Sequence, residues 1–403
     1  MRTLLVAIVA AVVVLGASPA QAQHGRMGLI DATPGITAPK VQLYTFGRGA
    51  LIFEKFGHTA LCLDYNEVSR ETACFNYGVT DFTAGGAALT WRFIRGKQVF
   101  FVEAIPLSGM LRFYKAEDRT IWRQTLPLTE AQARAVEAKL LSDLDPKNGS
   151  YIYDHFVDNC TTRLRDIIDT GSGGVLKRDS GAAFPLTLRD MGRRGMAELP
   201  PLIAFGDFAV GRYIDHHPTL WGAMFHPFVL RDEVAARFGV PAEVIYERQG
   251  PPIPDDGPTG RVWSLLIGLA LLAPLAAARL TGRFERGALA IAAVPAGLLG
   301  LVIWIVAIIS TIPSLRWNEA LLLYLPLDLA LPFLGAVKRR QYARVRLGMV
   351  VLVSLLRAVG LFMQPLWIPI ALAFGLHGLV AFDVRRTAAA AASRATAATP
   401  AAG

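Results

Sequence analysis

Three cysteines and seven histidines are the side chains of this 403-residue chain best suited to nucleophilic chemistry. Cys62 and Cys74 lie on two consecutive apolar stretches joined by a polar connection at residues 65–71. A hairpin centred near residue 68 places the two opposite each other, within disulfide reach. An oxidising compartment favours that pairing. Cys160 is then an odd thiol, which in an exported protein is a candidate reactive group.

Cys160 stands where a helix is expected to begin. The sequence Asp-Asn-Cys-Thr-Thr-Arg around it precedes an apolar helical face that contains Leu164, Ile167 and Ile168. Free amides and the helix dipole at such a terminus stabilise a thiolate and lower its pKa. The same amides can donate hydrogen bonds to an oxyanion. The alternative is a buried cysteine that packs as a small apolar side chain.

A nucleophilic thiol needs a base, and His58 is the natural partner. It opens the strand that leads to Cys62, and Gly57 beside it allows close approach of backbone or substrate. The alternative is a histidine that is merely hydrogen-bonded. The remaining histidines lie near the N-terminus, just before the thiol, in a late aromatic stretch or in an apolar segment: His24, His155, His216, His217, His226 and His377.

Other chemistries lack their motifs. The sequence has no Cys-x-x-Cys or His-x-x-x-His spacing for a metal, and adjacent His216 and His217 suit a shared ion badly. It has no Gly-x-Ser-x-Gly elbow and no phosphate-cradling or haem-attachment motif. We therefore expect no metal and no cofactor.

The charge of the chain is unevenly distributed. The net charge is +9 and 53% of the residues are hydrophobic. Residues 261–403 carry 14 Lys and Arg against 4 Asp and Glu, whereas residues 1–260 carry 27 against 28. The basic excess therefore accompanies the apolar C-terminal part, and no basic face remains to suggest a nucleic-acid partner.

The N-terminus predicts export. Arg2 precedes an apolar run at residues 4–16, and Ala20-Gln-Ala22 matches the small-x-small pattern of signal peptidase sites. Cleavage after Ala22 is the prediction. An uncleaved anchor is the alternative, although the apolar run is short for a span.

The C-terminal part predicts an all-α bundle of about five transmembrane helices. The expected spans are residues 262–280, 287–309, 318–337, 347–362 and 366–382. If the N-terminal domain is exported, the basic clusters at residues 279–286, 338–346 and 385–386 all fall on the cytoplasmic side, as the positive-inside rule requires. The chain is then integral to the inner (cytoplasmic) membrane and multi-pass, with a periplasmic domain.

The expected domains follow from these boundaries. They are a signal peptide (1–22), a periplasmic domain (23–247), a Pro/Gly-rich linker (248–261), a transmembrane domain (262–386) and a disordered cytoplasmic tail (387–403). The periplasmic domain predicts an α+β fold. Strands are expected at 41–46, 59–64, 72–77 and 98–105, one helix at 131–144 and another from Thr161.

Two charges fall inside expected spans. Asp328 and Arg357 each lie near the middle of one, where an isolated charge is costly, so we expect them to pair. Such a pair either forms a polar site for a lipid headgroup or proton, or sets the register of two helices.

Several strings resemble a known family. FGHTAL from Phe56, FNYG from Phe75 and YIYDHFVDNCTTR from Tyr151 are similar to the N-terminal periplasmic domain of the Lnb lipoprotein N-acyltransferase family. DHHPTLWGAMFHP from Asp215 and NEALLLYLPLDL from Asn318 extend the resemblance. The family's soluble domain is similar to permuted papain-like enzymes, relatives of NlpC-type peptidases and of lecithin:retinol acyltransferase. In that order the histidine precedes the cysteine, as here.

The resemblance implies acyl transfer through a thioester. Cys160 attacks an ester of a membrane phospholipid donor while His58 takes the thiol proton. The acyl chain then passes to an amine, expected to be the N-terminal cysteine of a lipoprotein or another envelope acceptor. Helix-start amides, with Asn159 and Thr161, hold the oxyanion.

Two further residues belong to this expected site. In an antiparallel pair that places Cys62 opposite Cys74, Asn76 lies opposite Ala60, two residues from His58. Asn76 can then orient the imidazole of His58. Tyr153 lines the site, or is an ordinary core aromatic. Two other functions stay open: a cysteine hydrolase of cell-wall peptide with the same dyad, and a non-enzymatic envelope protein whose spans bind a partner.

Overall fold

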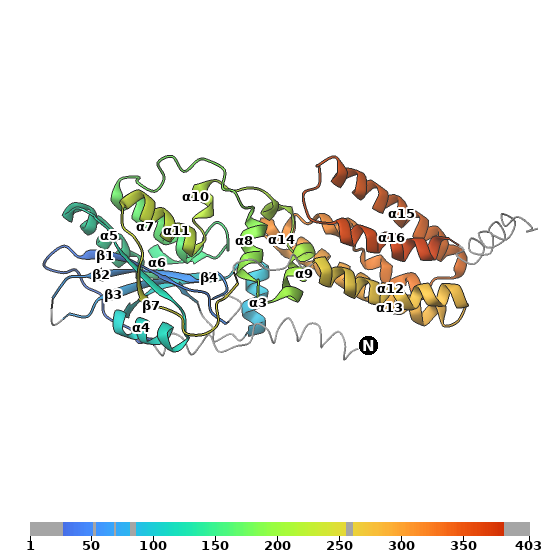
Figure 1. Cartoon of the computed structure of the whole chain (residues 1–403), viewed down its shortest axis with the longest axis horizontal. Helices are drawn as coiled ribbons and strands as arrows, with labels where there is room; N and C mark the ends of the chain where they lie inside the picture. Colours follow the sequence, from blue (N-terminus) through green and yellow to red (C-terminus); the bar gives the residue numbers. More distant parts are fainter. Residues whose placement is uncertain (1–26, 51–53, 68–69, 81–85, 255–260, 383–403) are drawn as a thin grey trace, which may run out of the picture. The chain divides into compact units, whose positions relative to one another are not determined.

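The computed structural model describes residues 27–50, 54–67, 70–80, 86–254 and 261–382 (Figure 1). The chain divides into two compact units. We call residues 27–196 and 216–254 the sheet domain, and residues 197–215 with 261–382 the helical unit. The expected signal peptide and cytoplasmic tail lie outside the described residues, as does residue range 255–260 of the expected linker.

A seven-stranded antiparallel sheet organises the sheet domain, in the order β6-β4-β3-β2-β1-β5-β7. The strands are β1 (Lys40–Phe46), β2 (His58–Asp64), β3 (Ala73–Val79), β4 (Val99–Pro106), β5 (Ile121–Thr125), β6 (Tyr151–Ile152) and β7 (Glu243–Tyr246). The first four agree with the expected strands to within two residues. The last three were not predicted, because each is short and carries little alternating apolar pattern.

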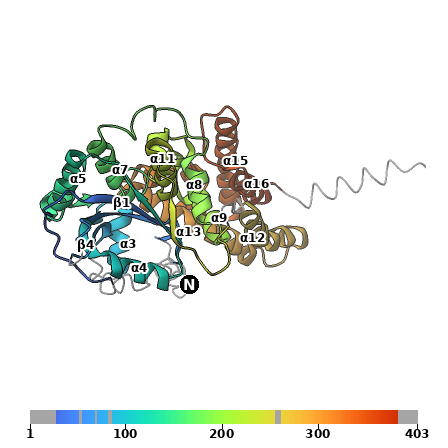
Figure 2. The ribbon, with the colours of Figure 1, turned by 60° about the vertical axis from the view of Figure 1, so that its left-hand side comes forward.

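Helices cover both faces of this sheet (Figures 1 and 2). The helices of the sheet domain are α3 (Gly86–Ile94), α4 (Leu107–Ala116), α5 (Glu130–Asp143), α6 (Pro146–Gly149), α7 (Cys160–Ser172), α8 (Leu188–Gly195), α10 (Leu220–Ala223) and α11 (Pro227–Phe238). The core on one face joins strand residues to α5, α7 and α11, through Val136, Leu164 and Leu230 among others. The core on the other face contains Met110 and Phe113 of α4. The fold is a mixed α and β domain with helices on an antiparallel sheet, as expected.

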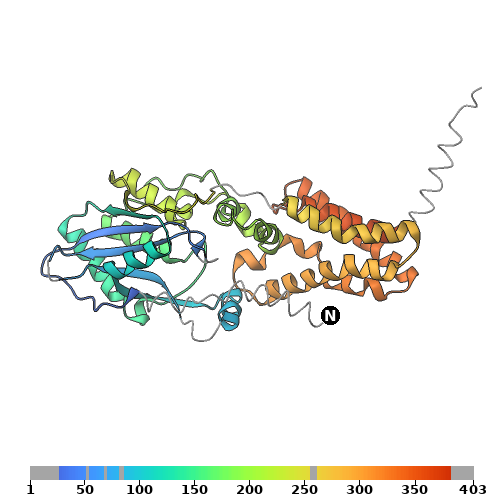
Figure 3. The same cartoon turned by 60° about the horizontal axis from the view of Figure 1, so that its bottom comes forward.

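The helical unit contains four long or medium helices and several short turns. Its elements are α9 (Pro200–Ala209), η2 (Arg212–Asp215), α12 (Arg261–Thr281), α13 (Glu285–Ile309), α14 (Pro313–Arg316), η3 (Glu319–Leu322), η4 (Pro326–Phe333), α15 (Ala336–Ala358) and α16 (Trp367–Ala381). Figure 3 shows the long helices, coloured yellow to red, lying side by side. Among the described residues, α12 and α13 are long and apolar enough to cross a membrane, and α16 is apolar but shorter.

The expected helix at 318–337 is not formed. This segment consists of the 3-10 turns η3 and η4, with Pro326 at the start of η4 and Pro332 inside it. Two prolines six residues apart remove backbone donors and clash with the preceding turn, so a continuous α-helix cannot pass through both. The irregular backbone lies against glycines of α13: a Cβ added at Gly300 would come within 2.6 Å of the Tyr324 carbonyl oxygen.

The predicted pair of Asp328 and Arg357 is also wrong. Asp328 pairs with Arg346, whose Nη2 lies 3.1 Å from Oδ2, and both side chains are at most 2% exposed. Arg357 lies eleven residues further along α15, which at 1.5 Å per residue is about 16 Å away. It donates instead to the Phe362 carbonyl at 3.2 Å.

Arg346 also stabilises the irregular segment. It donates to the carbonyl oxygens of Leu322, at 2.9 Å, and Leu323, at 2.5 Å, between η3 and η4. Carbonyls that an α-helix would satisfy internally are thus satisfied by a buried guanidinium. Helix α15 begins eleven residues before the expected span 347–362, so the basic run at 338–340 is helical.

Residues 197–215, which we expected in the soluble domain, cluster with the helical unit. Asn318 donates to the carbonyl oxygens of Phe208 and Ala209 at 2.8 and 3.1 Å. Gln364 donates to the Val210 carbonyl at 3.1 Å. These bonds fix the end of α9 to the loops that flank η3 and α16.

Candidate active site

Cys160 is the first residue of α7, and its position is fixed by a capping box. The Asn159 side chain accepts from the Thr162 amide at 2.9 Å, and the Thr162 hydroxyl accepts from the Asn159 amide at 2.8 Å. The thiol is free and half-buried. The amide groups of Cys160 and Thr161 precede the first intrahelical hydrogen bonds, so they can face a substrate oxygen.

His58 is the first residue of β2, and Asn76 on β3 holds its ring. Nε2 lies 2.7 Å from the Asn76 Oδ1. An amide oxygen only accepts, so Nε2 carries the proton and Nδ1 is the basic nitrogen. This leaves Nδ1 to act on the thiol.

The environment of Cys160 activates its sulfur. Burial raises the pKa of the thiol, but the charge of His58 and a hydrogen bond from it, with hydrogen bonds from the Thr161 hydroxyl and the Thr59 backbone, lower the pKa below its ordinary value. The Thr161 Oγ1 lies 3.8 Å from the sulfur and 3.2 Å from the Thr59 Oγ1. The structure thus brings Cys160, His58 and Asn76 into one connected group.

Two glycines give the imidazole its room. Gly57 has a φ of +83°, and a Cβ there would lie 2.6 Å from the Phe46 carbonyl oxygen. A Cβ at Gly78 would lie 3.1 Å from the His58 Cε1 and 3.4 Å from the Asn76 Oδ1. Gly57 is a position for glycine alone, and Gly78 is in tight contact with the His58–Asn76 pair.

The three residues expected to bind substrate occupy different positions. Both donors of the Asn159 amide are engaged, with the carbonyl oxygens of His155 at 2.9 Å and Phe225 at 3.1 Å. Thr161 is fully buried beside the sulfur. Tyr153 lies near the thiol, close enough that a thiolate charge acts on its phenol, and its hydroxyl is 3.1 Å from the His155 Nδ1.

The other two cysteines are joined. Cys62 and Cys74 face each other on β2 and β3, with an S–S distance of 2.04 Å. Since the sequence contains three cysteines, Cys160 is the one free thiol.

Other polar groups are not part of this arrangement. His217 bonds the Phe184 carbonyl at 3.0 Å, and His226 accepts from the Phe228 amide at 3.3 Å. No group of three or more possible metal ligands occurs within the described part of the chain. Thr59, Gly78 and His155 lie inside the motif strings FGHTAL, FNYG and YIYDHFVDNCTTR, but their contacts at the site were not predicted, because a string of residue types does not say which atoms meet in the fold.

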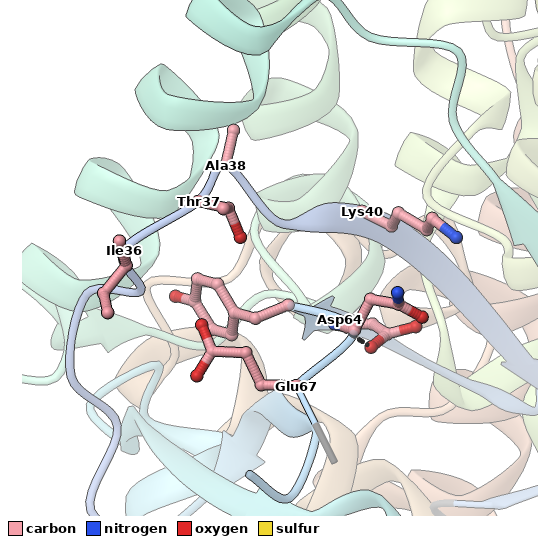
Figure 4. Close-up of a pocket in the computed structure, with 8 residues that line it drawn as sticks. Ile36, Thr37, Ala38, Lys40, Asp64 and Glu67 are labelled. Carbon is pink, nitrogen blue, oxygen red and sulfur yellow. Dashed lines mark hydrogen bonds between the residues drawn. The ribbon is translucent and has the colours of Figure 1, made fainter. Parts of the chain in front are cut away.

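A separate hollow lies at the far end of the same strand. It is lined by Ile36, Thr37, Ala38, Lys40, Asp64 and Glu67 (Figure 4). Asp64 is six residues from His58 along β2, or about 20 Å. This hollow is therefore not the space in front of the thiol.

The geometry defines a class of protein: a thiol-bearing α and β domain, followed by helices of which two are apolar enough to cross a membrane. Residues 36–194, which include Cys160, His58 and Asn76, match the family described as the Lnb N-terminal periplasmic domain. This match confirms the resemblance predicted from the motifs. No curated protein matches the chain, and no solved structure matches it. Residues 36–194 are therefore similar to the periplasmic domain of the Lnb family.

Proposed function

We propose that this protein is a membrane-bound acyltransferase that moves a fatty acyl chain from phospholipid, through a thioester on Cys160, to an amine. The observation that carries the proposal is the connected group of the thiol, His58 and Asn76. A thiol of lowered pKa beside an oriented imidazole is the arrangement of nucleophilic catalysis.

The reaction proceeds in two balanced halves. In the first, the sulfur attacks the ester carbonyl while His58 Nδ1 takes the thiol proton, and the lysolipid alcohol leaves with that proton. In the second, the amine attacks the thioester, its proton passes to His58 and returns to the sulfur, and an amide is released. The amides of Cys160 and Thr161 stabilise both tetrahedral oxyanions. Asn76 is a positioning residue.

A lipid donor accounts for the helical unit. We propose that it crosses the inner membrane, with the irregular segment 310–335 as one of five crossings and the sheet domain in the periplasm. Exposed Trp263, Trp317 and Trp367 then lie at the periplasmic interface, and the basic residues 338–340 at the cytoplasmic end. A non-helical crossing is tolerated because its backbone is buried against protein and bonded by Arg346.

The acceptor is proposed to be the α-amino group of a diacylglyceryl cysteine at a lipoprotein N-terminus. Such a group lies at the membrane surface, and its reaction with a thioester gives a stable amide. The resemblance of residues 36–194 to the Lnb periplasmic domain supports this acceptor.

Trapping the thioester tests this function. The full-length protein in detergent is mixed with phosphatidylethanolamine labelled in its acyl chains, without acceptor. We expect label on the protein that neutral hydroxylamine releases and that Cys160→Ala abolishes. A diacylglyceryl-cysteinyl peptide should then receive the label, and its N-acetylated form should not.

The other outcomes separate the alternatives. Label that appears as free fatty acid, or cleavage of cell-wall peptide without acyl-enzyme, indicates a cysteine hydrolase. If Cys160→Ala folds normally and retains the biological function, the role is non-enzymatic.

A further inference from the structure

His155 is a partly buried imidazole, with its Nε2 atom buried, that the proposed reaction does not use. It lies among aromatic rings, with centroid distances of 4.3 Å to Phe56, 4.9 Å to Phe156 and 5.6 Å to Phe225. Its backbone carbonyl accepts the Asn159 side chain that caps α7. The ring is therefore fixed relative to the helix start that carries Cys160.

The two ring nitrogens of His155 have different surroundings. Nδ1 lies 3.1 Å from the Tyr153 hydroxyl oxygen. Nε2 is buried, and among the residues that the structure describes it has no hydrogen-bond partner. Burial lowers the pKa of this histidine to about 4, so the ring is neutral at pH 7 and holds one proton.

This asymmetry selects the tautomer. With the proton on Nε2, a buried N–H would have no acceptor, which is among the costliest polar defects in a protein. With the proton on Nδ1, the N–H donates to the Tyr153 oxygen, and only a lone pair faces the aromatic rings. The second tautomer leaves the smaller defect at His155, and it frees the O–H of the partly buried Tyr153 to donate to another acceptor.

In this tautomer the phenol proton of Tyr153 takes no part in the hydrogen bond with His155. The Tyr153 ring is held by Phe100, at 4.7 Å, and Phe93, at 5.8 Å, and its amide donates to the Gln98 carbonyl at 3.0 Å. Burial, followed by the charges of Cys160 and Asp154, raises the pKa of this phenol, so it keeps its proton. The hydroxyl is thus a neutral donor on a phenol that lies within electrostatic range of the Cys160 sulfur.

We propose that His155 is a positioning residue whose Nδ1–H holds the Tyr153 oxygen and directs the phenol proton to the oxyanion formed at Cys160. This inference rests on the proposed function. It assigns the side-chain oxyanion donor to Tyr153, because the Asn159 amide is engaged by two carbonyl oxygens and the Thr161 hydroxyl lies against Thr59.

A double-mutant cycle tests the assignment. Removing an oxyanion donor costs about 100-fold or more in kcat, and we expect that loss for Tyr153→Phe with labelled phosphatidylethanolamine as donor. His155→Leu should lower kcat about tenfold with KM unchanged. His155→Asn places an amide N–H near the Nδ1 position and should restore most of the rate. In the Tyr153→Phe background, His155→Leu should have no further effect.

Two results would contradict the inference. If His155→Leu lowers the rate equally in both backgrounds, or slows alkylation of Cys160 by iodoacetamide, its role is structural and the inference fails. The alkylation rate reports folding of the site without needing a substrate.

The tautomer can be measured without activity. In protein labelled with ¹⁵N-histidine, with the His155→Leu variant for assignment, we expect a protonated Nδ1 and an unprotonated Nε2. The reverse pattern overturns the inference, even if the thioester forms. The expected pattern without any thioester would instead contradict the proposed function and leave the orientation of Tyr153 supported.

Discussion

In the sheet domain large exposed apolar side chains are dispersed, such as Trp91, Val157 and Val244. Helix α12 of the helical unit instead exposes many close together: Val262, Trp263, Leu265, Leu266, Ile267 and Leu269.

The interiors of the two units are more alike, since each unit buries an arginine that binds irregular backbone. Arg119 donates to the Gly47 carbonyl and pairs with Glu54, and Arg346 donates to the carbonyls between η3 and η4 and pairs with Asp328. The two units thus differ in how much continuous apolar surface they expose, not in how they satisfy buried polar groups.

The largest expected effect tests the interior of the helical unit. Asp328→Ala leaves Arg346 buried without its carboxylate, and we expect a loss of about 3–5 kcal/mol of stability. Thermal unfolding of the full chain in detergent measures it. Arg357→Gln is the matched control on the same helix and should cost about 1 kcal/mol or less, since that side chain makes one carbonyl contact. Equal losses for the two variants would show that the buried pair has no special importance.

Removing the disulfide tests the sheet domain. The double variant Cys62→Ala/Cys74→Ala opens a bridge across 12 residues, and we expect a loss of about 3 kcal/mol. Thermal unfolding measures the loss. Adding reductant to the wild-type protein should lower its unfolding temperature by the same amount as the double substitution. Cys160→Ala should leave the transition unchanged, and a shift there would mean that the free thiol is structural.

A third prediction concerns the pH dependence of the thiol. The pKa of Cys160 lies below its ordinary value because His58 opposes the effect of burial, so wild-type alkylation by iodoacetamide should remain fast below pH 8. His58→Ala removes that charge and raises the thiol pKa. At pH 7 the rate should fall about tenfold, and the difference should vanish at high pH, where both thiols are ionised. A pH profile that is the same in both proteins would exclude the dyad.

The smallest effect comes from one methyl group. Gly78→Ala places a Cβ 3.1 Å from the His58 ring, so the imidazole must shift by a few tenths of an ångström. We expect a decrease in kcat of about threefold to tenfold with little change in stability. Gly181→Ala is the control, because a Cβ there meets nothing within 4 Å. Equal kcat for the two variants would mean that the site tolerates displacement of the ring.

The sequence was most informative where one feature constrains another. Two cysteines on adjacent strands predict the pairing of β2 with β3, and that pairing brings Asn76 within reach of His58. The structure has the same alignment, with Cys62 opposite Cys74. The apolar face of Leu164, Ile167 and Ile168 likewise predicts a helix from Thr161, and α7 begins one residue earlier, at Cys160.

Sequence patterns were least informative where local and long-range structure disagree. Hydropathy predicts one span at 318–337, but Pro326 and Pro332 prevent an α-helix there. Asp328 was therefore placed at the wrong level among the helices, and its partner was predicted to be Arg357 instead of Arg346. The contacts of His155 depend on which rings surround each nitrogen, and no spacing along the chain encodes that. Edge strands as short as β6 carry too few residues for a pattern.

The bridge between Cys62 and Cys74 has a consequence beyond cross-linking. Their α-carbons are direct partners in the ladder, so sliding β3 by one residue along β2 would carry the sulfurs apart and turn Asn76 to the opposite face. Only chains whose strands are aligned as in the native sheet can close this bond. Formation of the disulfide therefore retains the strand alignment on which the position of the His58 imidazole depends.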